Sequence, residues 1–399
     1  MKREIDNKAE WFRLFRERYR KANRSGKKSL LDELISVHGM HRKSAIRLMA
    51  VRRAGRKAEG KPRGPKPRYQ AKAFTEALRQ VWRETKFMSS KLLKKAMSAY
   101  VPSVEKHYSA FPQEVKTLLF QISPAQIDRI LKPYKFKSKC GTKPGTLMRN
   151  EIPIQGSVWD IKIPGFIEAD TVAHCGNSLA GEFVWTLTLT DICTQWTECR
   201  AVWHKGAAGI VEQIKDIESI LPFSLRGFDC DNGSEFLNNY LIAYFSEKKK
   251  KVIDFTFTRS RPYHSNDNAH VEQKNWSHPR QLLGRERLEH IELVHLINDL
   301  YKNEFSLLKN FFHPNMKLDR KIRANSRFRR FYGSPMTPYE RVLNSDHVPD
   351  ETKTQLQNLY QTLDPIDLQR AVDRKARAIS SLNKKLNSKL PEPSFLMIA

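Results

Sequence analysis

Apolar positions at helical spacing predict a helical unit at the start of the chain. Residues 8–22 place aromatic and leucine side chains on one face, which is the pattern of an amphipathic helix. A second helix is expected from a cap at Ser29 to a break at Gly39, and a third over residues 41–51. Two helices joined by a glycine-containing turn are typical of a helix-turn-helix motif. The alternative is an ordinary helical hairpin with a basic surface.

A second group of helical segments covers residues 70–134. Near its end, Ser123, Pro124 and Gln126 combine a helix cap, a proline at the first helical position and a glutamine three residues after the cap. The helix that follows exposes Arg129 beyond its apolar face. We interpret this segment as a second helix-turn-helix-like module, with Arg129 as a DNA contact.

From residue 159 onward the hydrophobic period shortens to that of strands. Alternating apolar residues, separated by turn residues and by amphipathic segments, predict three strands at hairpin spacing and then strands that alternate with helices. This order indicates an α/β protein with a mixed five-stranded sheet covered by helices. The expected strands are residues 161–172, 182–190, 196–203, 225–231 and 252–258.

Charge is distributed unevenly along the chain. The 399 residues contain 71 Lys and Arg against 43 Asp and Glu, a formal net charge of +28, and residues 1–70 alone hold 22 basic and 7 acidic side chains. Clustered Lys and Arg release counterions from phosphates, so such a segment is the electrostatic footprint of a nucleic-acid binder. A generally basic, solvated protein is the alternative.

Cysteine usage and hydropathy limit the cellular location. The five cysteines are irregularly spaced and include no Cys-x-x-Cys pair, which favours neither a disulfide framework nor a zinc site. No apolar stretch approaches the roughly 18 residues that span a bilayer, and no secretory signal is evident at Met1. We therefore expect a cytoplasmic protein without membrane partners.

Three acidic residues lie at positions that suit a catalytic metal site. Asp170 lies in an apolar strand, Asp231 ends the fourth strand, and Glu272 lies on the helix after the fifth. If the first and fourth strands are neighbours, the three carboxylates converge and repel unless cations neutralise them. Hard oxygen ligands suit Mg²⁺, and two ions about 4 Å apart support in-line phosphoryl displacement. Taken singly, each acid has another interpretation: an arginine partner, a turn, or a solvated helix residue.

The segments around these acids resemble a known family. Asp170, then Asp231 in Asp-Asn-Gly-Ser-Glu-Phe, then Glu272 in Asn-Asp-Asn-Ala-His-Val-Glu are similar to the D, D, E triad of integrase-type DDE transposases, the enzymes of bacterial insertion sequences. The resemblance covers about residues 159–290 and extends to the helix-turn-helix region and to residues 337–341. It implies an RNase H-like core in which the three acids are catalytic ligands of two Mg²⁺ ions, with Mn²⁺ as an alternative.

The resemblance also implies a function. A transposase binds the ends of a transposon and catalyses DNA strand cleavage and strand transfer by two-metal phosphoryl displacement. Its partners are double-stranded DNA at the element ends and the target, and it works as a homo-oligomer on the bacterial nucleoid. The alternatives are a catalytically silent, sequence-specific DNA-binding protein derived from a transposase, and a nuclease without strand transfer.

The chain departs from this family at two places. The 40 residues between Asp231 and Glu272 are more than is usual, and Trp276 and Pro279 stand where retroviral relatives carry lysines. Lys274 and Arg280 are the candidates to replace those DNA contacts.

The remaining expected DNA contacts lie on the second helix of the helix-turn-helix, where residues near the start reach base edges; they are Arg42, Lys43 and Arg47. The predicted parts are a helix-turn-helix domain (1–53), a Gly/Pro-rich basic linker (54–69), a second helical DNA-binding module (70–134), a connector (135–158), the RNase H-like core (159–300) and a basic C-terminal region (301–399).

Overall fold

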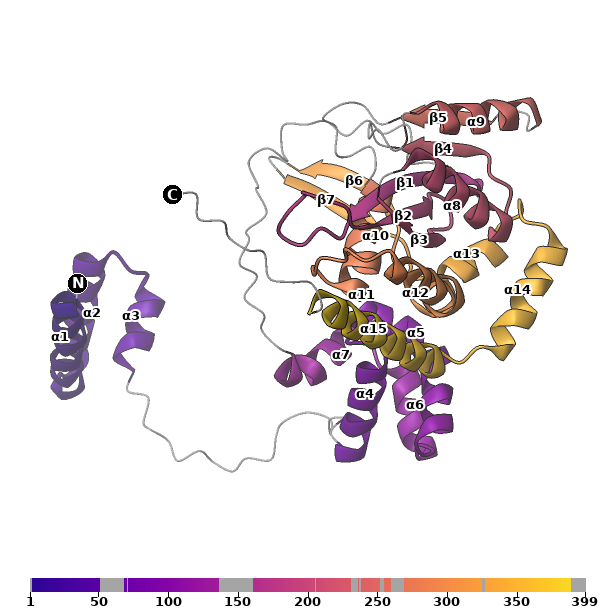
Figure 1. Ribbon diagram of the computed structural model, residues 1–399. Helices are drawn as coiled ribbons and strands as arrows, with labels where there is room; N and C mark the ends of the chain where they lie inside the picture. The colour runs from indigo at the N-terminus through magenta and orange to yellow at the C-terminus, as the bar shows by residue number, and fades with distance from the viewer. Residues whose placement is uncertain are drawn as a thin grey trace, which may run out of the picture. The chain divides into compact units, whose positions relative to one another are not determined.

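The chain forms two compact units, Met1–Pro67 and Arg68–Ala399 (Figure 1). The computed structural model describes residues 2–50, 68–69, 71–135, 161–204, 206–230, 236, 238–251, 255–259, 269–324 and 327–388. Among the helices in these ranges, none is both long enough and apolar enough to cross a membrane.

The first unit consists of three helices around a small core. They are α1 (Lys2–Lys21), α2 (Arg24–His38) and α3 (Arg42–Met49), and they bury Phe15, Leu34 and Met49 between them. The predicted cap at Ser29 is wrong, because the cap of α2 is Asn23, six residues earlier, whose side chain accepts a hydrogen bond from Gly26 N at 2.8 Å. The predicted end is confirmed: Gly39 adopts φ 60°, which closes the helix in the left-handed region.

The second unit begins with four helices that pack onto the rest of its core. These are α4 (Lys72–Glu84), α5 (Ser90–His107), α6 (Gln113–Gln121) and α7 (Pro124–Leu131), followed by a short 3₁₀ turn, Lys132–Tyr134. The predicted cap of α7 is confirmed, since Ser123 Oγ accepts from Gln126 N at 3.3 Å and Pro124 starts the helix. The buried side chains of these helices are continuous with those of the sheet, so the segment shares one hydrophobic core with it.

A five-stranded mixed sheet forms the centre of this unit. Its strands are β1 (Phe166–Ala173), β2 (Val184–Asp191), β3 (Thr197–Trp203), β4 (Gly227–Cys230) and β5 (Thr256–Arg259), in the order β3-β2-β1-β4-β5. Pairs β1–β2 and β2–β3 are antiparallel, whereas β1–β4 and β4–β5 are parallel. This order with these directions is RNase H-like, so the predicted fold class is confirmed.

Several predicted strand ends are displaced. The first strand starts at Phe166 rather than at residue 161, because Pro164 lacks an amide donor and Gly165 adopts φ 111°, a conformation that favours glycine. The fifth strand starts at Thr256; residues 252–254 of its predicted range, like Asp231 at the end of the fourth, lie outside the described residues.

One face of the sheet is apolar and packs on helices. Phe228 of β4 packs against Phe245 of α9 (Asn239–Lys251), with ring centroids 4.7 Å apart and the ring planes tilted by 41°. Helix α9 lies against α8 (Ala207–Ile220). The other face carries acids and is crossed by α10 (Ala269–Asn275). After α10 the chain widens into a π turn, Trp276–Arg280, in which Pro279 lacks the amide of a regular turn, and then forms α11 (Gln281–Leu283).

Two asparagines cover the free edge of the sheet at β3. Asn298, on α12 (Glu292–Leu300), bonds both the amide and the carbonyl of Ala201, at 2.7 and 2.9 Å. Asn310, in the second of the π turns Tyr301–Phe305 and Leu308–Phe312, bonds both groups of Thr197 at 3.0 Å. Each carboxamide therefore takes the place of a neighbouring strand, which protects the edge from pairing with another chain.

The C-terminal region is a two-stranded ribbon followed by three helices. The ribbon is β6 (Leu318–Ala324) paired antiparallel with β7 (Arg327–Tyr332). The helices are α13 (Pro338–Leu343), which starts with a Thr337–Glu340 capping box, α14 (Asp350–Thr362) and α15 (Pro365–Asn387). Helix α15 packs on both α5 and α12 and so joins the N-terminal helices of the unit to its sheet.

Candidate active site

Two acids of the central strand β1 point toward helix α10. Glu168 and Asp170 share a face because side chains alternate along a strand. Glu168 is buried, and its Oε2 accepts a hydrogen bond from Val271 N at 3.0 Å. Asp170 is half-buried; its Oδ2 accepts from Asn275 Nδ2 at 2.6 Å and its Oδ1 from its neighbour's amide at 2.7 Å. The first and last turns of α10 are thus bonded to adjacent acids of β1.

Strand β4 lies beside β1 in parallel register. Ala169 is opposite Cys230, one residue before Asp170 in β1, and Asp231 follows Cys230 in the sequence. The close pairing requires glycine at position 227, because a Cβ there would overlap the ring of Phe166. The neighbour relation between the first and fourth strands, on which the predicted convergence of acids depends, is therefore present.

The structure describes the three predicted catalytic residues to different extents. Asp170 is placed in β1, at the face that α10 crosses. Glu272 belongs to α10, but its side chain is not among those described, and Asp231 lies outside the described residues. Whether the three carboxylates meet, and whether they bind metal, stays a prediction.

Two residues without a predicted role hold this site together. Glu168 anchors the start of α10, and Asn275 fixes the carboxylate of Asp170 from the end of that helix. A signal for Asn275 was present in its position: it lies three residues after Glu272, a spacing that places two side chains on the same helix face.

Lys274 does not lie where a DNA contact is expected. Its side chain is buried, 7% exposed, and Nζ donates to the carbonyl of Gln195 at 3.5 Å. Burial, with the nearby charges of Arg341 and Lys309, lowers the pKa of Lys274 to about 7. An ammonium inside the protein cannot reach a phosphate while α10 keeps this position, so the structure argues against the predicted contact.

Around Lys274 is a buried basic cluster, which comprises Lys274, His278, Lys309 and His313. Burial lowers the pKa of Lys309 to about 8 and those of His278 and His313 below their ordinary range. Lys309 Nζ lies 3.3 Å from His313 Nδ1. Burial therefore favours the neutral form of all four groups, most strongly for the two histidines.

The other predicted DNA contacts are on or near the surface. Arg42 is ion-paired with Asp32 of the same unit, whereas Lys43 and Arg47 are exposed on α3. Arg129 is exposed and donates to Gln126 Oε1 at 3.1 Å, and Arg280 is half-buried. These positions leave the prediction of DNA contact open to experiment.

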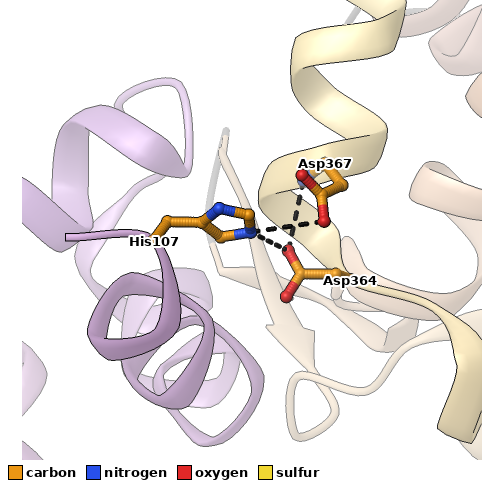
Figure 2. Close-up of side chains that lie close together, drawn as sticks. All are labelled: His107, Asp364 and Asp367. Carbon is orange, nitrogen blue, oxygen red and sulfur yellow. Dashed lines mark hydrogen bonds and ion pairs between the residues drawn. The ribbon is translucent and has the colours of Figure 1, made fainter.

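Among the described side chains, one group of three has the spacing of metal ligands: His107, Asp364 and Asp367 (Figure 2). Asp364 caps α15, because its Oδ1 accepts from Ile366 N at 2.9 Å and from Asp367 N at 3.1 Å. The same oxygen lies 3.1 Å from His107 Nε2, at the end of α5.

Two cations already face this group. Arg370 lies 3.2 Å from His107 Nδ1, and Lys106 Nζ is 3.4 Å from Asp364 Oδ2. Although burial alone raises the pKa of Asp364, the hydrogen bonds from Ser103 and the α15 amides lower it overall. We interpret the group as a helix cap that joins α15 to α5, separate from the acids of β1.

Comparison with known proteins gives one extensive match. No protein-family model matches the chain. The chain is 34% identical over 335 residues to a protein of Sinorhizobium fredii (strain NBRC 101917 / NGR234) named "Uncharacterized protein y4rM", an alignment that covers 82% of this chain and 92% of the relative.

Similarity to solved structures is confined to part of the chain. The catalytic core domain of HTLV-2 integrase, solved with magnesium in a dimeric form, matches 38% of this chain and 91% of its own, at 13% identity and a TM-score of 0.28. The BIV integrase catalytic core matches 46% and 96%, at 16% identity and a TM-score of 0.27. At these scores, the fold assignment rests on the strand order of the chain itself.

Proposed function

The chain belongs to the family of the uncharacterized protein y4rM of Sinorhizobium fredii, and we propose that it is a DNA transposase. The sheet would carry the active site, with Asp170, Asp231 and Glu272 as its catalytic acids. The reaction would be cleavage of a DNA strand at an element end, followed by attack of the freed 3′-hydroxyl on target DNA.

One observation carries this proposal: the parallel pair β1–β4 beside helix α10. In this pair Ala169 is opposite Cys230. Asp170 follows Ala169 in β1, and Asp231 follows Cys230 in the sequence. The contacts of Val271 and Asn275 with β1 hold the helix that contains Glu272 across the same strand. Asp170 in β1 and Glu272 in α10 thus belong to adjoining elements, and Asp231 follows the last residue of β4 in the sequence.

The residues present suit a divalent cation. Carboxylates are the hard oxygen ligands that Mg²⁺ takes, and each carboxylate oxygen has more than one lone pair. Asp170 can therefore keep its bond from Asn275 while it coordinates a metal. Bound Mg²⁺ ions, held by Asp170, Asp231 and Glu272, would supply charge stabilisation at the phosphorus. Asn275 would hold the Asp170 carboxylate in a single orientation.

The first unit would recognise the element ends. Lys43 and Arg47 are exposed on α3, the second helix of the predicted helix-turn-helix, and exposed cations on such a helix can reach a DNA groove. Joining two ends requires two active sites, so a homo-oligomer would form on the DNA.

A cleavage and joining assay tests the proposal. The full chain is incubated with Mg²⁺ and the DNA that flanks its gene, with Asp170→Asn and Asp231→Asn beside the wild type. Asp346→Asn, which makes the same change at an exposed residue of the same unit, is the matched control. We expect nicks at inverted ends and joined products from the wild type and the control, and a loss of at least about 100-fold in both active-site variants.

A second substrate separates the alternatives. DNA with a pre-exposed 3′-hydroxyl is joined by a transposase and left unjoined by a simple nuclease. Binding without metal-dependent products from any protein would overturn the enzymatic proposal and identify a silent DNA-binding relative. Equal activity of Asp231→Asn and the wild type would show that the site lies elsewhere.

A further inference from the structure

The β6–β7 ribbon is a strongly basic element with exposed side chains on both faces. Its sequence, residues 318–332, contains six Lys and Arg and a single acid, Asp319. Two apolar side chains are also exposed, Ile322 at 47% and Tyr332 at 52%. Among the described elements, neither strand packs extensively against anything but the other strand. The ribbon therefore gains little stability from a core of its own.

One face of the ribbon holds two arginines on an aromatic ring. Arg320 is opposite Phe331, and Ile322 is opposite Arg329, so the four side chains share a face. The guanidinium carbons of Arg320 and Arg329 lie 4.8 and 5.1 Å from the centroid of the Phe331 ring. Cation–π contacts of this kind contribute about 0.5–1 kcal/mol each at exposed sites, and they restrict where the two charges point before any partner binds.

The base of the ribbon is fixed to the second unit. Asn315 and Met336 form a β-bridge with hydrogen bonds of 2.9 and 3.1 Å, and Gly333 N donates to Lys317 O at 3.0 Å. Arg341, in α13, donates to the carbonyl of Asn315 at 2.8 Å. The strands thus extend from an anchored base.

A two-stranded ribbon without a core is marginal in water, and several like charges on adjacent strands destabilise it further. A polyanion would remove the repulsion and use the arginines that Phe331 orients. Duplex DNA fits in shape as well, because its major groove, about 12 Å wide, admits a two-stranded ribbon.

We propose that the β6–β7 ribbon is a clamp for duplex DNA, in which Arg320 and Arg329 bind phosphates. This proposal rests on the proposed function in one respect: both take duplex DNA as the substrate. It assigns to the C-terminal region a contact that is separate from both the acids of β1 and the predicted helix-turn-helix.

Salt-dependent binding of the full chain tests this assignment. Affinity for a duplex of arbitrary sequence, and for a single strand of equal length, is measured by fluorescence anisotropy over a series of salt concentrations without divalent metal. The test variant is Arg320→Gln/Arg329→Gln. The matched control is Arg374→Gln/Arg377→Gln, which removes the same charge from two exposed residues of α15.

The expected result follows from counterion release. Loss of two phosphate contacts lowers the slope of log affinity against log salt by about 2 and weakens duplex binding roughly 10- to 100-fold at moderate salt. The control pair should change the slope by less than half as much. As a control, the melting temperatures of both double variants are compared with that of the wild type, and equal values show that the second unit is intact.

A further variant examines the aromatic platform. Phe331→Leu keeps every charge of the ribbon but removes the ring under Arg320 and Arg329. We expect duplex affinity to fall about threefold, in line with cation–π energies below about 1 kcal/mol, with no change in the salt slope because the number of cations is the same.

Two results would overturn the proposal. Equal slopes and affinities for the ribbon and control variants would show that the ribbon is only a solvated surface. A loss confined to the single strand would exclude duplex DNA as the partner. Because binding is measured without metal, failure of the cleavage assay leaves this test unaffected.

Discussion

Replacement of Lys274 by methionine is expected to stabilise the protein at neutral pH. Lys274 is buried beside Lys309 and Arg341, and among the described residues its Nζ bonds only the carbonyl of Gln195, at the long distance of 3.5 Å. Methionine has a similar length and no charge, so it can occupy the same space without desolvating an ammonium.

The size of the effect follows from the pKa of Lys274. A lowering from 10.5 to about 7 corresponds to about 5 kcal/mol at 1.36 kcal/mol per unit. Because the folded pKa is the lower one, the unfolded chain binds more protons between about pH 7 and pH 10.5, and stability rises with pH across that window. Below about pH 7 the whole penalty is present. We expect methionine to recover on the order of 2–4 kcal/mol there, since packing around the new side chain offsets part of the gain.

Chemical unfolding at two pH values measures this prediction. Denaturant midpoints and slopes of the full chain are compared at about pH 7 and about pH 9.5, inside the window that the linkage relation defines. Lys385→Met, at an exposed position of α15, is the control for loss of a lysine charge. The Lys274→Met variant should unfold at higher denaturant than the wild type at pH 7, and the difference should shrink at pH 9.5.

Two outcomes would refute the reasoning. If Lys274→Met unfolds at lower denaturant than the wild type at pH 7, the native state stabilises the ammonium instead of opposing it. If the stability of the variant depends on pH as strongly as that of the wild type, other groups titrate in this range. Lys309, whose pKa is about 8, would then be the first of them to replace.

Two other predictions concern single asparagines. Asn310→Ala leaves the amide and carbonyl of Thr197 at the β3 edge without their partner, and should lower the free energy of unfolding by about 1–3 kcal/mol. Denaturant titration measures this loss, and increased self-association is a second readout. Unchanged stability would mean that solvent bonds the two groups of Thr197 equally well. Asn275→Ala removes one hydrogen bond to the Asp170 carboxylate and should lower the rate of metal-dependent cleavage roughly tenfold or more. A wild-type rate would show that Asp170 needs no positioning from α10.

The sheet was predictable from sequence because its strands alternate or run apolar between clear turn residues. Alternation along β1 also explains why Glu168 and Asp170 share a face. Ends were harder, because several residues can cap a helix and local pattern does not choose among them. Asn23 and Ser29 are both competent caps, and the earlier one is used.

Burial of individual polar residues was not predictable from local pattern. Lys274 has the sequence context of an exposed helix residue, yet α10 is covered on the side of Gln195. What covers it comes from segments far along the chain, including the turn with Lys309 and helix α13 with Arg341. The pairing of β6 with β7 was not predicted, since it depends on register rather than on composition.

Helix α10 makes interactions of opposite sign. Acids of β1 accept a hydrogen bond from the amide of Val271 and another from the side chain of Asn275, the last residue of the helix. Lys274 is enclosed by the protein and bonds the carbonyl of Gln195 at the long distance of 3.5 Å, and its burial opposes stability. The favourable bonds to β1 are therefore partly offset by the buried lysine. The backbone of Glu272 lies between these two sets of contacts, so changes at Lys274 and Asn275 are expected to act on the same helix in opposite directions.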